Sequence, residues 1–591
     1  MTRKILLVLL VLCALFSLFS CKEIVDLLPD DLIDNLPDTP TDILPDIPTD
    51  ILPDFGSDDG ADQYSKGLRF ESNGDGSCYV KDIGIFTGTS LIVPPTSPDG
   101  DRVVAIGGYA FNSNQEITEL VLPETVVEIG DGAFENCFSL EKVTLLGSVE
   151  RIGKRAFRQC RFTEIDLGEG PMHIGDYAFA SCEKLTAINL SPNTVYIGEF
   201  AFDAWIGTIT SIHVPASVEY IGERGLGNRS NMTEISFAEG DRPLVLGAGA
   251  FDGCRFDSVT LPARTKEIGD RAFASCKRLK SINFPDGIEK IGAYAFEYCD
   301  LLKSAILPDS ITELGEGAFL GCEKMSEVRL PSSLTVLPSY LLQQCRSLAE
   351  IDLPDGLVSI GDMALSCCVK VSVIDIPDGV THIGDEAFYA TDITELSFPE
   401  GVTYLGSGVL RDCDKLTTVN WPKAVDSIPP RFFLDCTSLV FEIPESVKRI
   451  NFEAFRGCNA LEKIDLHDGI TYMDHSAFSY CEGLTEISLS TNLKIIPDRA
   501  FERCTSLTKI IIPEGVKRIG QYVFYGCGSI SEVYLPLSLE TIENDCFCVS
   551  DEVETKVFYA GGEADFALIN INSSNDLLLP EKITFNYRSE D

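Results

Sequence analysis

The sequence predicts a β-rich solenoid of about 20 stacked coils with a cap at each end. Three observations predict this fold. One motif recurs at a nearly constant spacing, each copy contains a short alternation of apolar and polar residues, and most copies place a cysteine at the same position. The chain has 591 residues, of which 45% are hydrophobic. That length allows several compact domains or one elongated array, and the recurring motif favours the array.

The motif reads I-G-x-x-A-F-x-x-C-x-x-L-x-x-I-x-L-P-x-x-V-x-x and recurs from Val104 onward. Its phenylalanine position can be followed from Phe111 to Phe547 through 20 copies. Of the 19 steps between these copies, 13 are of 23 residues and the others are of 22, 24 or 25. No single copy can bury its own apolar face, so the copies must stack on one another.

Each copy predicts one short strand. In Glu164-Ile165-Asp166-Leu167 apolar and polar residues alternate, which indicates a strand with one buried face. The proline that follows the strand in most copies ends it, because proline has no backbone donor. The I-G-x-x-A-F segment then returns the chain on the opposite side. Strands stacked at about 4.8 Å would give a curved rod on the order of 100 Å long.

A ladder of cysteines is predicted inside the stack. Fifteen copies place cysteine three residues after the phenylalanine position, and we call these residues the cysteine ladder. Disulfides would need tight geometry at every step, and an odd number cannot pair fully. Cysteine buries well as a small apolar residue, so buried free thiols are expected. The members are Cys137, Cys160, Cys182, Cys254, Cys276, Cys299, Cys322, Cys345, Cys368, Cys413, Cys436, Cys458, Cys481, Cys504 and Cys527.

The N-terminus predicts a lipoprotein signal peptide over residues 1–21. Arg3 and Lys4 precede an apolar run that is too short for a membrane span and suits a signal peptide. Ser20-Cys21 resembles a bacterial lipobox, in which the cysteine thiol is acylated and becomes the new N-terminus. Cys21 is therefore the expected lipid attachment site. The alternative is ordinary cleavage, which would release a free secreted protein.

Residues 22–66 predict a disordered stalk rich in proline and aspartate. The stretch holds 13 acidic and 2 basic residues and repeats TDILPDIP as TDILPDFG. Proline keeps the backbone extended and the aspartates repel one another. The expected organisation is then an N-terminal cap over residues 67–103, the solenoid over 104–550 and a C-terminal cap over 551–591.

The net charge is -44, from 91 acidic and 47 basic residues. Such a surface repels phosphate backbones and anionic headgroups, so nucleic acid is excluded as an expected partner. Most of this charge is expected to keep the surface solvated. A preference for basic partners or cations is the functional alternative.

The repeats resemble the BspA-like, treponemal-type leucine-rich-repeat family over roughly Val104 to Phe547. The flanks agree, because residues 67–95 resemble the N-terminal cap of such arrays and residues 557–587 resemble their C-terminal closing hairpin. The resemblance implies a bacterial surface protein. It also implies an adhesin for host matrix proteins, epithelium or other bacteria, as some members of the family are.

The outward positions of the predicted strands form a polar, acidic face with almost no aromatic residue. Sugar sites usually use aromatic platforms, so this face favours a protein partner. Ordinary solvated strand residues are the alternative for each position. The candidate contact residues are Glu327, Arg329, Glu350 and Asp352. Trp205 is a further candidate because it lies in irregular copies of the repeat. A binding insertion or neutral drift can each explain that irregularity.

No enzyme is expected. The five histidines fall at variable repeat positions without metal-ligand spacing, and the chain has no glycine-rich phosphate loop or nucleophile elbow. Catalytic residues, metal ligands and cofactors are therefore not assigned. The leading hypothesis is a monomeric, extracytoplasmic protein at the cell surface or outer membrane, which meets the membrane only through its N-terminal lipid. It would bind a host-matrix or bacterial surface protein through the solenoid face. The alternative is a glycan-binding accessory protein for nutrient capture.

Overall fold

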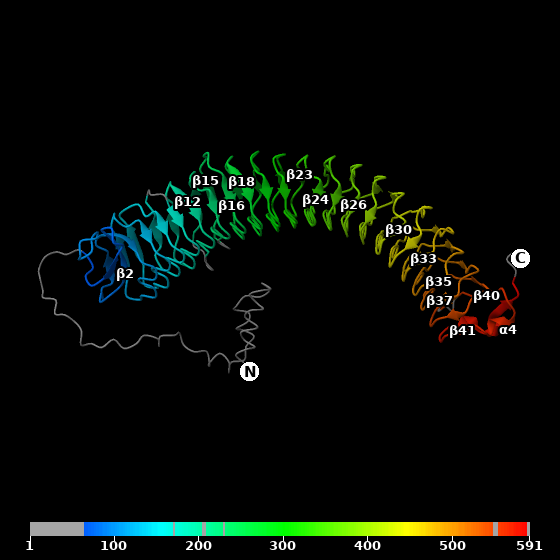
Figure 1. The fold of residues 1–591 in the computed structure, drawn as a ribbon. Coiled ribbons are helices and arrows are strands. Elements are labelled where there is room, and N and C mark those ends of the chain that lie inside the picture. The colour runs from blue at the N-terminus through cyan, green and yellow to red at the C-terminus, as the bar shows by residue number, and fades with distance from the viewer. Residues whose placement is uncertain (1–63, 169–171, 204–208, 228–230, 548–552, 588–591) are drawn as a thin grey trace, which may run out of the picture. The chain divides into compact units, whose positions relative to one another are not determined.

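The computed structural model describes residues 64–168, 172–203, 209–227, 231–547 and 553–587. The expectations for the signal peptide with Cys21, for residues 22–63 of the stalk and for Trp205 lie outside these residues. Residues 64–66 of the expected stalk are described, and the Ser65 N–H donates to the Ile92 carbonyl oxygen at 2.8 Å. Residues Gln63–Asp591 form one compact unit, in which the coils follow one another in a single row from β2 to β41 (Figure 1). The predicted β-solenoid is confirmed, and each coil buries its interior against its two neighbours.

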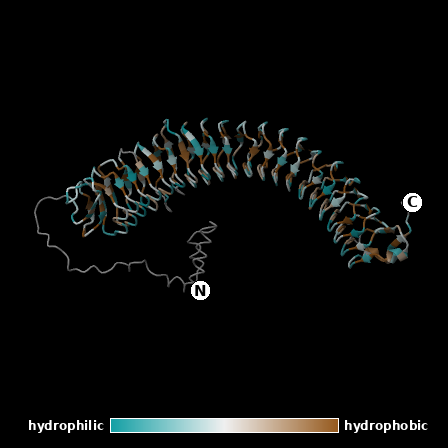
Figure 2. Cartoon of the chain, in the orientation of Figure 1, coloured by the Kyte–Doolittle hydropathy of each residue, from teal (hydrophilic) through white to brown (hydrophobic). Residues whose placement is uncertain are grey.

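The first strand row contains the strands predicted from the repeat. In β9 the central Ile165 is buried while Glu164 and Asp166 are exposed, and β9 pairs in parallel with β11. Brown and teal alternate along the strands in Figure 2 for this reason. The row consists of β3 (Ser90–Ile92), β5 (Glu119–Leu122), β7 (Lys142–Leu145), β9 (Glu164–Asp166), β11 (Ala187–Asn189), β13 (Ser211–Val214), β15 (Glu234–Phe237), β17 (Ser258–Val259), β19 (Ser281–Ile282), β21 (Ser304–Ile306), β23 (Glu327–Arg329), β27 (Glu395–Ser397), β29 (Thr418–Asn420), β32 (Lys463–Asp465), β34 (Glu486–Ser488), β36 (Lys509–Ile511), β38 (Glu532–Leu535), β40 (Lys556–Tyr559) and β42 (Ile583–Phe585).

A second strand row runs through the isoleucine of the Ile-Gly pair, and the sequence had not predicted it. Its strands are mostly two residues long and pair in parallel from coil to coil. They are β2 (Ser77–Asp82), β4 (Arg102–Ile106), β6 (Glu128–Ile129), β8 (Arg151–Ile152), β10 (Met172–Ile174), β12 (Thr194–Ile197), β14 (Tyr220–Ile221), β16 (Leu244–Leu246), β18 (Thr265–Ile268), β20 (Lys290–Ile291), β22 (Glu313–Leu314), β24 (Val336–Leu337), β25 (Ser359–Ile360), β26 (His382–Ile383), β28 (Tyr404–Leu405), β30 (Ser427–Ile428), β31 (Arg449–Ile450), β33 (Tyr472–Met473), β35 (Ile495–Ile496), β37 (Arg518–Ile519), β39 (Thr541–Ile542) and β41 (Asn570–Ile571).

The glycine of the Ile-Gly pair lets neighbouring coils approach closely. A Cβ added at Gly315 would lie 2.3 Å from the backbone nitrogen of Ala293 in the preceding coil. The N–H of Gly315 also donates to the carbonyl oxygen of Ile291 at 2.7 Å, which extends the second row. Glycine at this position therefore sets the spacing between coils as well as the hydrogen bond.

Three prolines divide the second row. Pro338, Pro429 and Pro497 replace the glycine in their coils, and proline has no N–H to donate to the coil before it. The second-row sheets end at these coils, so that new sheets begin with β24, β30 and β35. At all three junctions the first row stays paired, through β21–β23, β27–β29 and β32–β34.

The core consists of stacked rings and the cysteine ladder. The ring of Phe296 lies 5.4 Å from those of Phe273 and Phe319, almost parallel to both, and all three are fully buried. Fourteen ladder thiols each donate to the carbonyl oxygen at the phenylalanine position of the preceding coil, at 2.9–3.4 Å. Burial raises the pKa of the Cys137 thiol to about 12. The described ladder cysteines are free and buried, as predicted.

The two ends continue the stack. At the N-terminal end β1 (Arg69–Ser72) pairs antiparallel with β2, whose other edge pairs in parallel with β4. The C-terminal hairpin expected from the family resemblance is wrong, because β40 and β42 pair in parallel. Between them the chain makes one further coil through α4 (Glu563–Phe566), β41 and two short 3₁₀ segments, Asp576–Leu578 and Pro580–Lys582. The apolar residues of this segment thus extend the core by one more layer.

A buried arginine stabilises the irregular copies. The step between Leu226 and Phe251 is the longest in the array, and residues 241–243 form an exposed loop within it. The guanidinium of Arg264 lies beneath this loop, 6% exposed, and reaches back across two coils. It donates to the carbonyl oxygens of Pro215 at 3.1 Å, Ala238 at 3.3 Å, Arg242 at 3.3 Å and Val218.

Arg264→Met is expected to lower the free energy of unfolding by about 2 kcal/mol, because the carbonyl oxygens of Val218, Ala238 and Arg242 would lose the donor that the guanidinium provides. Thermal and urea unfolding followed by circular dichroism would measure the change. Arg242→Met is the matched control, since the exposed Arg242 guanidinium only pairs with Glu219 at 2.6 Å. The control should change stability by less than about 1 kcal/mol. Equal losses in the two variants would contradict the role of Arg264.

Candidate functional site

The first strand row is interrupted, unlike the core beneath it. Leu146 takes the place of the proline after its strand, and its N–H donates to the Leu122 carbonyl oxygen of the preceding coil at 3.0 Å. Pro354 has no N–H to make the equivalent bond. Within the described residues, the segments 349–353 and 373–376 form no backbone hydrogen bond at all. The face therefore opens between coils at these places.

Groove A lies between β23 and the segment 350–355, with a volume of about 770 Å³. It is within the size range of ligand sites in proteins. Its lining contains Glu327, Arg329, Glu350 and Asp352, which are the four contact residues proposed from the sequence. Glu327 and Arg329 lie on β23, and Glu350 and Asp352 lie on the next coil. Ile306, 41% exposed, contributes an apolar wall.

The charges of groove A are mostly uncompensated. Among the described residues, Glu327, Glu350, Asp352 and Asp355 have no basic partner within 4.0 Å. Arg329 is turned toward the preceding coil, where its Nη2 lies 3.5 Å from Oδ2 of Asp309. The groove thus presents four carboxylates and one already paired guanidinium. A cationic group can enter it without displacing an existing ion pair.

Groove B was not predicted. It lies between residues 373–378 and the coil of β27, with a volume of about 540 Å³. Asp375, Asp378, Glu395 and Glu400 line it without any basic residue, and Val373 is 62% exposed at its wall. Asp375 and Glu395 stand at the outward strand positions that the repeat predicts. Asp375 lies in the segment without backbone hydrogen bonds, whereas Glu395 lies on β27, which pairs with β29, and no sequence signal marks this difference.

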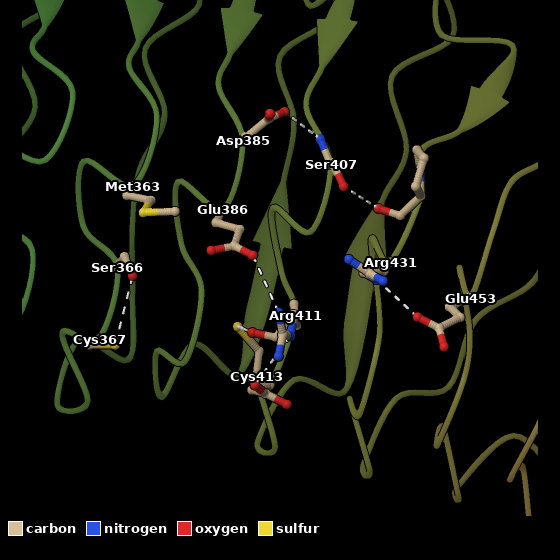
Figure 3. A network of polar contacts seen from close by, with 12 residues as sticks. Met363, Ser366, Cys367, Asp385, Glu386, Ser407, Arg411, Cys413, Arg431 and Glu453 are labelled. Carbon is tan, nitrogen blue, oxygen red and sulfur yellow. Dashed lines mark hydrogen bonds and ion pairs between the residues drawn. The ribbon is translucent and has the colours of Figure 1, made fainter. Parts of the chain in front are cut away.

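Most other acidic residues near the grooves serve the stack itself. Figure 3 shows Asp385 accepting from the backbone N–H of Ser407, at 2.7 Å, and Glu386 paired with Arg411 at 3.3 Å. Farther along, Glu453 pairs with Arg431 at 2.9 Å. Each of these contacts joins one coil to the next. The acidic groups of the grooves differ because, among the described residues, they have no basic partner within 4.0 Å, except for Glu400, which pairs with Lys423 at 2.9 Å.

The second row carries an aromatic ladder that the sequence analysis missed. His173, Tyr196 and Tyr220 occupy successive outward positions, with ring centroids 6.0 and 5.3 Å apart. Burial and the nearby carboxylates of Glu199 and Glu223 raise the pKa of Tyr220. Because the rings stack on one another, their faces are largely occupied and mainly their edges face solvent. The scarcity of aromatic residues therefore holds for the first row but not for the second.

The described residues contain neither a metal-binding group of side chains nor a membrane-spanning helix. No group of three or more histidine, cysteine or acidic side chains there has an arrangement that could hold a metal ion. Among the helices of the same part of the chain, none has the length and apolar character needed to cross a bilayer.

Comparison with known proteins identifies the repeats. The model of the BspA type leucine rich repeat region (6 copies) matches residues 104–233, 244–346, 321–440 and 440–554, which together exceed half of the chain. No curated protein matches.

Among solved structures, the chain is similar to a leucine-rich repeat protein from Bacteroides ovatus, at 25% identity. The match covers 86% of this chain and 99% of that one, with a TM-score of 0.35. A leucine rich cell surface protein from Faecalibacterium prausnitzii is 18% identical over 86% of this chain and 97% of that one, with a TM-score of 0.29. Because the repeat model spans most of the array described above, the chain belongs to the BspA type leucine-rich repeat family.

Proposed function

We propose that this chain is a lipid-anchored bacterial cell-surface protein that binds a protein partner, as an adhesin or receptor, through the first strand row at groove A. Groove A carries the proposal, since its four contact residues gather around an apolar wall and three of them are uncompensated carboxylates. Membership of a family of repeat scaffolds supports binding rather than catalysis. The proposed partner is a host-matrix or bacterial surface protein, bound by a monomer.

An array of purified matrix and bacterial surface proteins, probed with the full chain, tests the proposal. The double variant Glu350→Gln/Asp352→Asn is expected to weaken capture about tenfold, because it removes two charges from the groove. Glu164→Gln/Asp166→Asn is a closely matched control. Both sites read Glu-Ile-Asp-Leu, but Glu164 and Asp166 lie on β9, which is paired with β11. The proposal fails if no protein is captured, or if both double variants lose binding equally.

The lipid anchor has its own test. Cys21→Ala should release the protein from the membrane fraction into the soluble fraction, because the thiol that would carry the lipid is gone. The Lys22→Ala variant, which leaves that thiol in place, is the control. Continued membrane association of the Cys21→Ala variant would contradict lipid attachment.

The second candidate function is glycan binding for nutrient capture, and the aromatic ladder of the second row favours it. Tyr196 and Tyr220 offer ring edges and hydroxyl groups to a carbohydrate. A glycan array distinguishes the two functions. Binding that is lost in Tyr220→Ala and kept in Glu350→Gln/Asp352→Asn would support the glycan function over the protein function.

A further inference from the structure

The two grooves share an unusual feature of the backbone. The extended segments 349–353 and 373–376 form no backbone hydrogen bond within the described residues. In groove A the facing strand β23 pairs only with β21, so its other edge is also unpaired. Unpaired edges of extended chain are places where a further strand can add through its main-chain groups.

We propose that grooves A and B receive an extended peptide in which basic residues alternate with aliphatic ones, bound by main-chain hydrogen bonds to the segments 349–353 and 373–376. This inference rests on the proposed function and specifies the part of the protein partner that is recognised. An extended peptide places successive side chains on opposite faces, so one register directs its basic residues outward beside the carboxylates and its aliphatic residues inward toward Leu330 and Leu353, which pack on the core.

Charge complementarity selects the basic residues. Groove A presents Glu327, Glu350, Asp352 and Asp355 without a basic partner within 4.0 Å among the described residues. Groove B presents Asp375, Asp378 and Glu395 in the same state, while Glu400 pairs with the exposed Lys423 at 2.9 Å. A neutral peptide would leave these carboxylates uncompensated, and an acidic peptide would be repelled by them.

Apolar side chains of the grooves favour the aliphatic parts of the peptide. Leu330 and Leu353 line the inward side of groove A, where Leu330 is buried and Leu353 is partly buried. On the outward side Ile306 is 41% exposed at groove A and Val373 is 62% exposed at groove B, where the aliphatic stems of the basic residues can cover them. Covering these surfaces would remove apolar area from water and favour binding.

Binding of synthetic peptides to the full chain tests the inference. The probe is a short fluorescent peptide in which lysine alternates with valine, and fluorescence anisotropy measures its affinity at low salt. Methylating alternate backbone nitrogens keeps every side chain and charge but removes hydrogen-bond donors. That peptide is expected to bind at least about tenfold more weakly. Replacing lysine with glutamate should abolish binding.

The protein variants locate the site. Glu350→Gln/Asp352→Asn should weaken binding of the lysine–valine peptide at groove A about tenfold and leave groove B as the remaining tight site, whereas Glu164→Gln/Asp166→Asn, in a paired strand of the same sequence, should leave both sites unchanged. Circular dichroism would confirm that both variants are folded. The inference is overturned if the N-methylated peptide or a linear polyamine binds as tightly as the probe, because charge alone would then explain binding.

The failure of the inference can be distinguished from that of the proposed function. If the array captures a protein through groove A but the peptides do not bind, recognition uses a folded surface and only the inference fails. If the peptides bind as expected and the array captures nothing, the adhesin or receptor function fails while the grooves remain peptide sites.

Discussion

Raising the pH from 8 to 10 is expected to lower the free energy of unfolding by about 5 kcal/mol through four ladder thiols alone. Burial raises the pKa of Cys137, Cys182, Cys368 and Cys481 to about 12. In the unfolded chain these thiols would titrate near 9. Between these values the unfolded state loses protons that the folded state keeps, so stability is full below pH 9 and falls as the pH rises toward 12.

Urea unfolding at a series of pH values from 8 to 10 would measure this slope. The variant with all four cysteines replaced by alanine is the control. It starts less stable, because it lacks four small side chains and their hydrogen bonds, but it should lose about 5 kcal/mol less over the same range. This range lies below the raised pKa of buried tyrosines such as Tyr559. Identical slopes for the two proteins would contradict the assignment.

Phe296→Ala is expected to cost about 3–5 kcal/mol of unfolding free energy, since it removes a fully buried ring and leaves a cavity between two stacked neighbours. The loss should spread, because Phe273 and Phe319 each lose a stacking partner at 5.4 Å. Hydrogen exchange should therefore accelerate first in the coils on either side of the substitution.

Phe138→Ala is the matched control for this substitution. Phe138 is also a phenylalanine of the array, but its side chain is 42% exposed. Its replacement should change the free energy of unfolding by less than about 1 kcal/mol. Similar losses at both positions would show that the stacked rings do not carry the core. Chemical unfolding monitored by circular dichroism suffices for the comparison.

The sequence predicted those parts of the fold that repeat strongly. The alternation in Glu164-Ile165-Asp166 marked the first row, and the fixed spacing of phenylalanine and cysteine marked the core. The second row escaped prediction because a strand such as Lys290–Ile291 contains a single buried residue. Two residues are too short to display an alternation. The closing hairpin was inferred from resemblance and not from any periodicity.

The candidate site could be predicted only in part. The outward strand positions singled out Glu327, Arg329, Glu350 and Asp352, and these four residues line one groove. However, the same four letters, Glu-Ile-Asp-Leu, are paired at residues 164–167 and unpaired at 350–353. Local sequence is therefore unable to distinguish a closed coil from an open one. The difference depends on how neighbouring coils pair, which only the three-dimensional arrangement reveals.

The prolines of the second row have a mechanical consequence for a protein that would be pulled by its partner. At Pro338, Pro429 and Pro497 a coil is fastened to the coil before it by strand hydrogen bonds along the first row only. A load that bends the array can thus separate the second-row side at these coils with fewer strand hydrogen bonds broken than elsewhere along that row. Compliance therefore has a preferred direction at these three places, which differs from that of the first-row openings at residues 349–353 and 373–376.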